Sequence, residues 1–149
     1  MSPPDAALQW ARILSSAINP LFVVLWLIAL WVAWRRKDTR LGPYCLASLA
    51  GLLVSYLVVH GFRWLGLWTE YPEFPSGHEA FAASIGTSLV ILDARLLAVT
   101  LPLLGILGVA LVRAHYHVPL DIAGALIVSP ILTWLCHFLV VKKTRTTSA

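Results

Sequence analysis

Two short segments of the chain contain the residue types that could carry out chemistry. The first reads Pro75-Ser76-Gly77-His78-Glu79. Ser76 is a natural helix N-cap, and Glu79, three residues further on, completes the Ser-x-x-Glu pattern of a capping box. A helix that begins here presents free backbone N–H groups and the positive end of its dipole, and both attract anions such as phosphate. Gly77 leaves room for close approach, and His78 can donate or accept a proton.

The second segment surrounds a His-x-x-x-Asp pair and reads Arg113-Ala114-His115-Tyr116-His117-Val118-Pro119-Leu120-Asp121. Because His117 and Asp121 are four residues apart, on a helical path the carboxylate can accept the imidazole N–H. Such a bond orients the ring and raises its basicity, which is how a histidine becomes a nucleophile. Taken alone, the spacing also fits a capping aspartate beside an interfacial histidine.

Both a metal site and a phosphate site have to be considered for these segments. The candidate metal ligands are His78, His115, His117 and Asp121. Two arginines, Arg63 and Arg113, accompany them, and converging guanidinium groups repel a divalent cation but attract an oxyanion. We therefore expect a phosphate site, with no metal and no other cofactor.

The composition of the chain decides where such a site can lie. Of the 149 residues, 59% are hydrophobic and 12% are charged, whereas soluble domains have roughly 45–50% and about 25%. The mean hydropathy is +0.81. This excludes a soluble enzyme, because so short a chain cannot bury that much apolar surface in its own core. We expect an integral membrane protein and no nucleic-acid partner. Cys45 and Cys136 lie in apolar stretches and predict neither a disulfide framework nor a thiol metal site.

The apolar runs predict an all-α transmembrane bundle of about five helices in a single domain, residues 1–149. The predicted spans are Ile13–Trp34, Tyr44–Phe62, His78–Leu92, Leu96–Val112 and Pro119–Val141. Asn19-Pro20 predicts either a kink in the first span or the end of a short N-terminal interfacial helix, residues 1–18. The third span is short and rich in Ala, Ser and Gly, so we expect it to be buried centrally. Gly105 and Gly108 of the fourth span predict close helix contact.

Basic residues predict the orientation of the bundle. Five spans place eight of the eleven lysines and arginines on one side, and short cytoplasmic loops are rich in these residues. They are Arg35, Arg36, Lys37, Arg40, Arg95, Lys142, Lys143 and Arg145. We expect a plasma (inner) membrane protein with an extracytoplasmic N-terminus and a cytoplasmic basic tail, residues 142–149. Both chemical segments then lie on the extracytoplasmic side.

With these residues assembled, the chain resembles the type 2 phosphatidic acid phosphatase superfamily. Pro75-Ser76-Gly77-His78 matches the family's second motif, Pro-Ser-Gly-His, in full. His117 and Asp121 match the end of the third motif, which is Ser-Arg, five residues, His, three residues, Asp. The resemblance covers roughly residues 56–124.

The resemblance implies a metal-independent hydrolase that forms a phosphohistidine. His117 would attack phosphorus, Asp121 would hold its ring, and His78 would protonate the leaving oxygen. The implied phosphate ligands are Arg63, Ser76, Gly77 and Arg113. The implied substrate is a membrane lipid phosphate or diphosphate; undecaprenyl diphosphate, phosphatidate and phosphatidylglycerol phosphate all qualify.

Other functions are compatible with the sequence. The family's first motif is Lys, six residues, Arg-Pro, and here Arg63 is followed by Trp64 and preceded, seven positions earlier, by Tyr56. Arg113 lies two residues closer to His117 than the third motif places it. These departures favour the alternative of a non-catalytic lipid-phosphate binder or a subunit of a membrane complex. A transporter or channel has less support, since no acidic residue lies near mid-membrane and no inverted repeat is evident.

Overall fold

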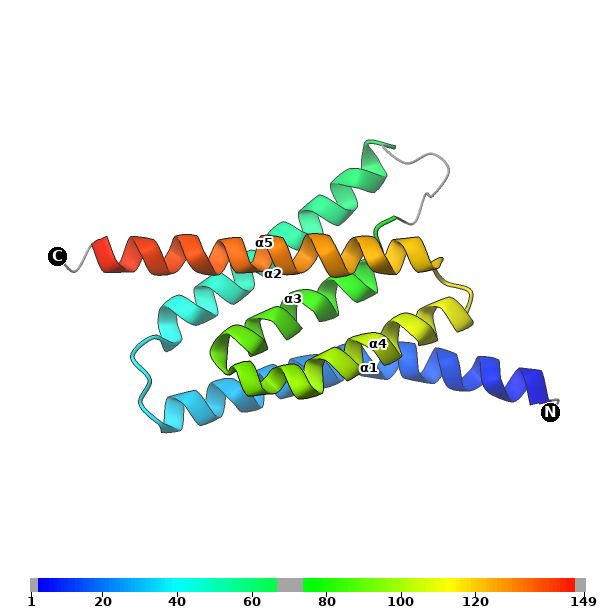
Figure 1. Ribbon diagram of the computed structural model, residues 1–149, viewed down its shortest axis with the longest axis horizontal. Helices are drawn as coiled ribbons and strands as arrows, with labels where there is room; N and C mark the ends of the chain where they lie inside the picture. The colour runs from blue at the N-terminus through cyan, green and yellow to red at the C-terminus, as the bar shows by residue number, and fades with distance from the viewer. Residues whose placement is uncertain (1–2, 67–73, 147–149) are drawn as a thin grey trace.

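The computed structural model describes residues 3–66 and 74–146. They form five α-helices and one short 3-10 turn, and this part of the chain contains no strand (Figure 1). The elements are α1 (Pro3–Arg35), α2 (Leu41–Trp64), α3 (Gly77–Leu92), η1 (Ala94–Leu96), α4 (Leu97–Arg113) and α5 (Pro119–Thr146). The prediction of an all-α bundle is therefore confirmed. Helix α5 continues through the first part of the predicted basic tail, and residues 147–149 of that tail lie outside the described residues.

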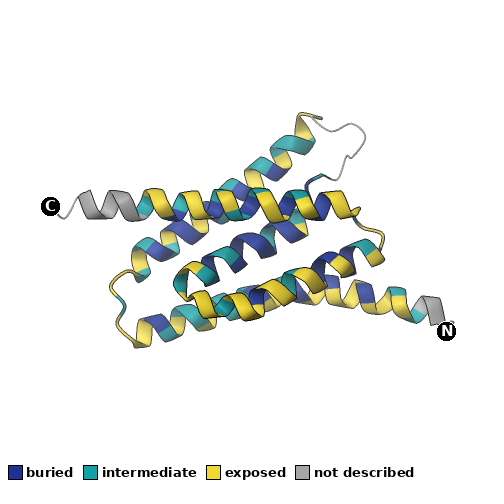
Figure 2. Ribbon diagram, viewed as in Figure 1, coloured by how far each residue is buried: buried dark blue, intermediate teal, exposed yellow. Residues whose placement is uncertain are grey.

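Helix α3 is the central element. It contacts each of the other four helices, and Figure 2 shows buried positions concentrated along it. The expectation that this small-residue helix is buried is confirmed, because small side chains let neighbouring backbones approach closely. Gly86 illustrates this: a Cβ atom built on it would lie 3.2 Å from the ring of Phe22 on α1. One apolar cluster joins α1, α3, α4 and the start of α5, and a smaller one joins α2, α3 and α5.

The other four helices expose their apolar side chains outward. Four helices among the described residues are long and apolar enough to cross a membrane, and only 17–28% of their apolar windows is buried inside the protein. Such surfaces require a hydrocarbon environment rather than water. The chain is therefore a membrane-spanning helical bundle, in which α3 is a shorter apolar helix of 16 residues.

Pro20 lies inside α1 and does not end it. Helix α1 runs without interruption from Pro3 to Arg35, so the alternative of a separate interfacial helix over residues 1–18 is not what forms. Figure 1 shows α1 changing direction partway along its length, as expected when a proline removes a backbone hydrogen bond.

The two ends of the bundle have different side chains. The α1–α2 and α3–α4 connections and the end of α5 lie together at one end (Figure 1), and this end carries Arg35, Arg36, Lys37, Arg40 and Arg95. In the first connection the Arg40 guanidinium donates to Asp38 at 3.0 Å and lowers the pKa of that carboxyl. The end of α2, the start of α3 and the α4–α5 connection lie at the opposite end, where both predicted chemical segments are found.

A buried polar cluster connects α2, α3 and α5 between these ends. His137 is 4% exposed, and its Nε2 lies 3.3 Å from Ser88 Oγ and 3.4 Å from Ser48 Oγ. Tyr44 donates its hydroxyl to the Ser88 carbonyl at 2.7 Å, and its ring lies beside His137. Hydrogen bonds of this kind hold membrane helices together.

Candidate active site

A cavity of about 690 Å³ opens between α1, α2, the start of α3 and the α4–α5 connection. It is lined by Ser15, Ser16, Asn19, Tyr56, His60, Arg63, Gly77, His78, Phe81, Tyr116 and His117. Two predicted catalytic residues and two predicted phosphate ligands are thus in one cavity, although they come from three separate parts of the chain. The rings of His78 and His117 are 6.4 Å apart, centroid to centroid, and meet edge to face. Rings at this separation can reach oxygen atoms of a single phosphoryl group.

His117 is fixed by the aspartate one turn further on. Its Nδ1 lies 3.2 Å from Asp121 Oδ2, and both side chains are almost completely buried, with 5% and 4% exposed. An ionised carboxylate can only accept hydrogen bonds, so this pairing favours the tautomer with the proton on Nδ1 and the lone pair on Nε2. A buried imidazole oriented in this way is a suitable nucleophile or general base.

Asp121 also caps its own helix. Oδ2 accepts the Val118 N–H at 3.1 Å, just before α5 begins at Pro119. The His-x-x-x-Asp spacing was compatible with an oriented histidine or with a helix cap, and the structure contains both. The same carboxylate oxygen contacts the His117 imidazole and accepts the Val118 N–H at the start of α5. Asp121 Oδ1 is buried and has no hydrogen-bond partner among the described residues.

The start of α3 presents free backbone donors. Ser76 is the N-cap, as predicted: its Oγ accepts the Glu79 N–H at 3.4 Å. The backbone N–H groups of Gly77 and His78 make no hydrogen bond within the described part of the chain. Nothing lies within 4 Å of a Cβ atom built on Gly77, which leaves space in front of these donors. This is the geometry of an anion site.

The prediction of a full capping box is wrong in its second half. A capping-box glutamate returns to the N-cap amide, but the Ser76 N–H instead donates to the Asp121 carbonyl at 3.1 Å. Glu79 points into the bundle, where it is fully buried and neither carboxyl oxygen has a hydrogen-bond partner in the described residues. The partner of the Ser76 N–H is the Asp121 carbonyl on α5, which tertiary packing brings close. The local Ser-x-x-Glu pattern carries no information about this contact.

Two further contacts hold the segment before α3 in place. The ring of Phe74 packs on Gly124 of α5, where a Cβ atom would lie 2.4 Å from a ring carbon. Arg63, near the end of α2, donates from Nη2 to the Pro75 carbonyl at 3.2 Å. Arg63 thus supports the loop and lines the cavity at the same time.

Arg113 is not part of this cavity. It is exposed and, with His115, lines a different cavity between α1 and α4. The connection turns sharply here, because His115 adopts a left-handed backbone with φ of 60°. Arg113 and His115 therefore line the cavity between α1 and α4, whereas Tyr116 and His117 line the candidate active site.

The candidate metal ligands do not come together in the described part of the structure. Among the described residues, no three His, Cys, Asp or Glu side chains lie close enough to share an ion. His115 lines the other cavity, away from His78 and His117.

Several lining residues were not among the predicted site residues. Ser15, Ser16 and Asn19 come from α1, which the motifs do not include, and Tyr56 and His60 form a ring contact 4.0 Å apart on α2. His60 and Arg63 are three residues apart in the sequence, so a polar stripe on α2 was the signal available. No sequence pattern indicated that α1 lines this cavity, and only the position of the helix in the folded bundle shows it.

Comparison with family models, with curated proteins and with solved structures gives no match to this chain, so any assignment of function rests on the geometry of this site.

Proposed function

We propose that the protein is a membrane lipid phosphatase that acts through a phosphohistidine. The observation that carries the proposal is the pairing of two imidazoles in one cavity, with His117 oriented by Asp121 and with His78 facing it at 6.4 Å. A nucleophile, its orienting carboxylate and a second acid-base group are the parts that covalent phosphoryl transfer requires.

In the first step the Nε2 lone pair of His117 forms a bond to phosphorus, and the bond from phosphorus to the leaving oxygen breaks. Protonated His78 gives its proton to that oxygen. The leaving group is a lipid alcohol when the substrate is a monoester and a lipid monophosphate when the substrate is a diphosphate. Asp121 stabilises the positive charge that develops on the His117 ring.

In the second step His78, now neutral, accepts a proton from water while the water oxygen attacks phosphorus. The P–N bond breaks and its electron pair returns to His117, which releases inorganic phosphate. Charge on the equatorial oxygens is stabilised by Arg63 and by the free N–H groups of Gly77 and His78. No metal or cofactor takes part in either step.

The surroundings of the cavity favour a lipid substrate. The cavity lies at one end of a bundle whose outer surface is apolar, so it faces the headgroup level of the bilayer. The basic residues of the opposite end favour a cytoplasmic location for that end. The cavity would then open on the extracytoplasmic side of the plasma membrane.

Phosphate release by the purified protein in detergent, with a chelator present, tests the proposal. We expect turnover by the wild type, inhibition by vanadate, and an acid-labile phosphate bound to the protein during turnover. His117→Ala should lose both the turnover and the bound phosphate. The matched control is His137→Leu, which removes a buried histidine outside the cavity and should keep both. Turnover that survives His117→Ala would overturn the mechanism.

A non-catalytic lipid-phosphate binder is the second candidate, because Arg63 is the only arginine among the described residues that line the cavity. It predicts that the wild type binds phosphorylated lipid and vanadate but releases no phosphate. In that case His117→Ala would weaken binding without changing any rate.

A further inference from the structure

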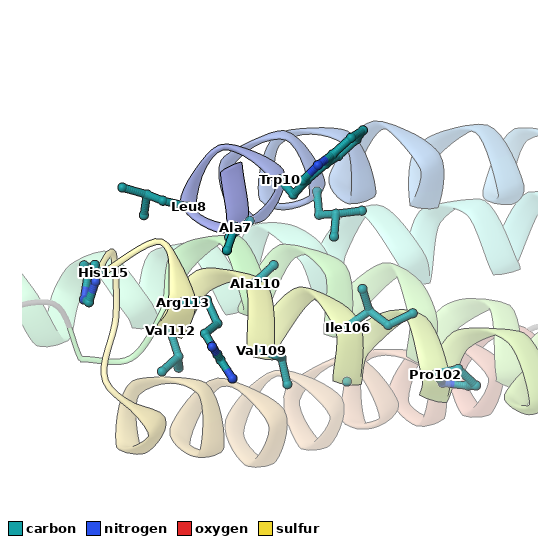
Figure 3. A pocket seen from close by; sticks show the side chains of 13 residues that line it. Ala7, Leu8, Trp10, Pro102, Ile106, Val109, Ala110, Val112, Arg113 and His115 are labelled. Carbon is teal, nitrogen blue, oxygen red and sulfur yellow. The ribbon is translucent and has the colours of Figure 1, made fainter. Parts of the chain in front are cut away.

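A second cavity is separate from the candidate active site. It has a volume of about 1270 Å³ and is a groove between the N-terminal half of α1 and the length of α4 (Figure 3). Its walls are the apolar residues Ala7, Leu8, Trp10, Ala11, Leu14, Pro102, Gly105, Ile106, Val109, Ala110 and Val112. Its polar residues are Arg113 and His115, at the end of α4 and in the following turn.

The dimensions of the groove match one leaflet of a bilayer. From Pro102 to Arg113 α4 rises about 16 Å, at 1.5 Å per residue. Half of a hydrocarbon core is about 15 Å. An acyl chain lying along this groove therefore extends from the headgroup level to the middle of the membrane.

The polar end of the groove has unsatisfied positive charge. Arg113 is exposed and pairs with no carboxylate in the described part of the chain. His115, whose backbone is left-handed, lines the same groove. A cation at the headgroup level above an apolar groove is complementary to an anionic lipid and not to a neutral one.

The groove and the active-site cavity lie on different faces of α1. Ala7, Ala11 and Leu14 line the groove, whereas Ser15, Ser16 and Asn19 line the active-site cavity. Neither Arg113 nor His115 lines the active-site cavity. A headgroup held by these two residues is therefore not presented to His117.

We propose that the α1–α4 groove binds one anionic phospholipid of the bilayer, distinct from the substrate. One acyl chain lies along α4 and the headgroup phosphate contacts Arg113 and His115. This lipid completes the packing between α1 and α4, and α1 is also a wall of the active-site cavity. The site does not depend on the proposed phosphatase activity, and it can be tested without measuring turnover.

The test uses Trp10, a groove residue that is 64% exposed, as the reporter. Purified protein in detergent is titrated with phosphatidylglycerol or phosphatidylcholine whose acyl chains are brominated and quench tryptophan. The Trp10 signal is the difference between the wild type and Trp10→Phe. We expect phosphatidylglycerol to quench at about fivefold lower concentration than phosphatidylcholine, the preference that one interfacial arginine provides.

Two pairs of variants locate the lipid. Arg113→Gln should abolish the fivefold preference, whereas Arg95→Gln, which alters an exposed arginine at the other end of α4, should keep it. Gly105→Phe fills the groove and should remove the Trp10 quenching by both lipids. It should still fold, because nothing lies within 4 Å of a Cβ atom at Gly105. Gly42→Phe places the same side chain in equally open space on α2 and should change nothing.

Three results of these titrations would overturn the proposal, and the vanadate control adds a fourth. They are equal quenching by the two lipids in the wild type, a preference that persists in Arg113→Gln, and quenching that persists in Gly105→Phe. Vanadate separates the bound lipid from the substrate: it competes at the active site and should leave the Trp10 signal unchanged. Displacement of the quenching lipid by vanadate would mean that the groove holds the substrate, and would equally overturn the claim of a separate site.

Discussion

His117 and His137 are both largely buried histidines on or beside α5, and their surroundings differ in two respects. His117 contacts a carboxylate and faces a cavity of about 690 Å³. His137 contacts two serine hydroxyls from α2 and α3 and lines none of the cavities described above. A carboxylate fixes the tautomer and raises basicity, whereas hydroxyls can donate or accept and impose neither. The surroundings of His117 therefore suit proton transfer or nucleophilic attack, whereas those of His137 suit hydrogen bonding between helices.

Residue type and burial alone do not distinguish these two histidines. The partner of the ring and the space in front of its free nitrogen distinguish the two.

The orienting carboxylate should have the largest effect after His117 itself. Asp121→Asn keeps the size of the side chain but lets the amide donate to Nδ1, which favours the wrong tautomer of His117. We expect phosphate release to fall by about 10³-fold. The readout that excludes a general folding defect is substrate binding, which should change little. A loss of less than tenfold would mean that Asp121 acts only as the cap of α5.

Removal of His78 should have an effect that depends on the leaving group. His78→Ala should slow hydrolysis of an alkyl phosphate by about 10²–10³-fold, because general acid catalysis is lost. A p-nitrophenyl phosphate needs little protonation of its leaving oxygen, so the loss with it should be much smaller. Equal losses with both substrates would assign His78 to phosphate binding instead of proton transfer.

The two arginines should differ in effect. Arg63 lines the cavity and supports Pro75, so Arg63→Ala should cost about 10²-fold in kcat/KM, the usual effect of losing one donor to the transition state. Arg113 faces the groove, so Arg113→Ala should cost much less with a short-chain substrate. The reverse order would mean that the α4–α5 connection rearranges when substrate binds.

The smallest effect is expected in the His137 cluster. His137→Leu removes the bonds to Ser48 and Ser88 and should lower the stability of the bundle by about 1 kcal/mol, the typical value of a hydrogen bond between membrane helices. Phosphate release should stay within about twofold of wild type. The midpoint of thermal unfolding in detergent measures the first effect. A loss of activity as large as that of His78→Ala would contradict the distinction between the two settings.

Local patterns predicted the helices well, because their causes are local. Apolar runs, the N-cap at Ser76 and the proline at the start of α5 act within one or two turns. The observed starts of α2, α3, α4 and α5 lie within three residues of the predicted ones, whereas α1 begins at Pro3, ten residues before the predicted Ile13. The pairing of His117 with Asp121 was predictable for the same reason, since a spacing of four residues is itself one turn.

Two glycines on α4 show that local sequence does not predict which face of a helix contacts a neighbour. Gly105 and Gly108 carry the same sequence signal for helix contact. A Cβ atom on Gly108 would lie 2.8 Å from Ile122 of α5, so the prediction is confirmed there. Gly105 faces the groove and has nothing within 4 Å, so the prediction is wrong there. Which face of a helix meets a neighbour depends on the packing of the whole bundle.

The membrane environment, the helices and the two chemical segments could be predicted from the sequence, because hydropathy and capping are properties of short stretches. The packing of the bundle decides that His78 and His117 share a cavity, that Arg113 faces a different one, that Glu79 is buried with no hydrogen-bond partner among the described residues, and that α1 lines both cavities. These outcomes depend on contacts between residues far apart in the chain, such as those that α3 makes with each of the other four helices.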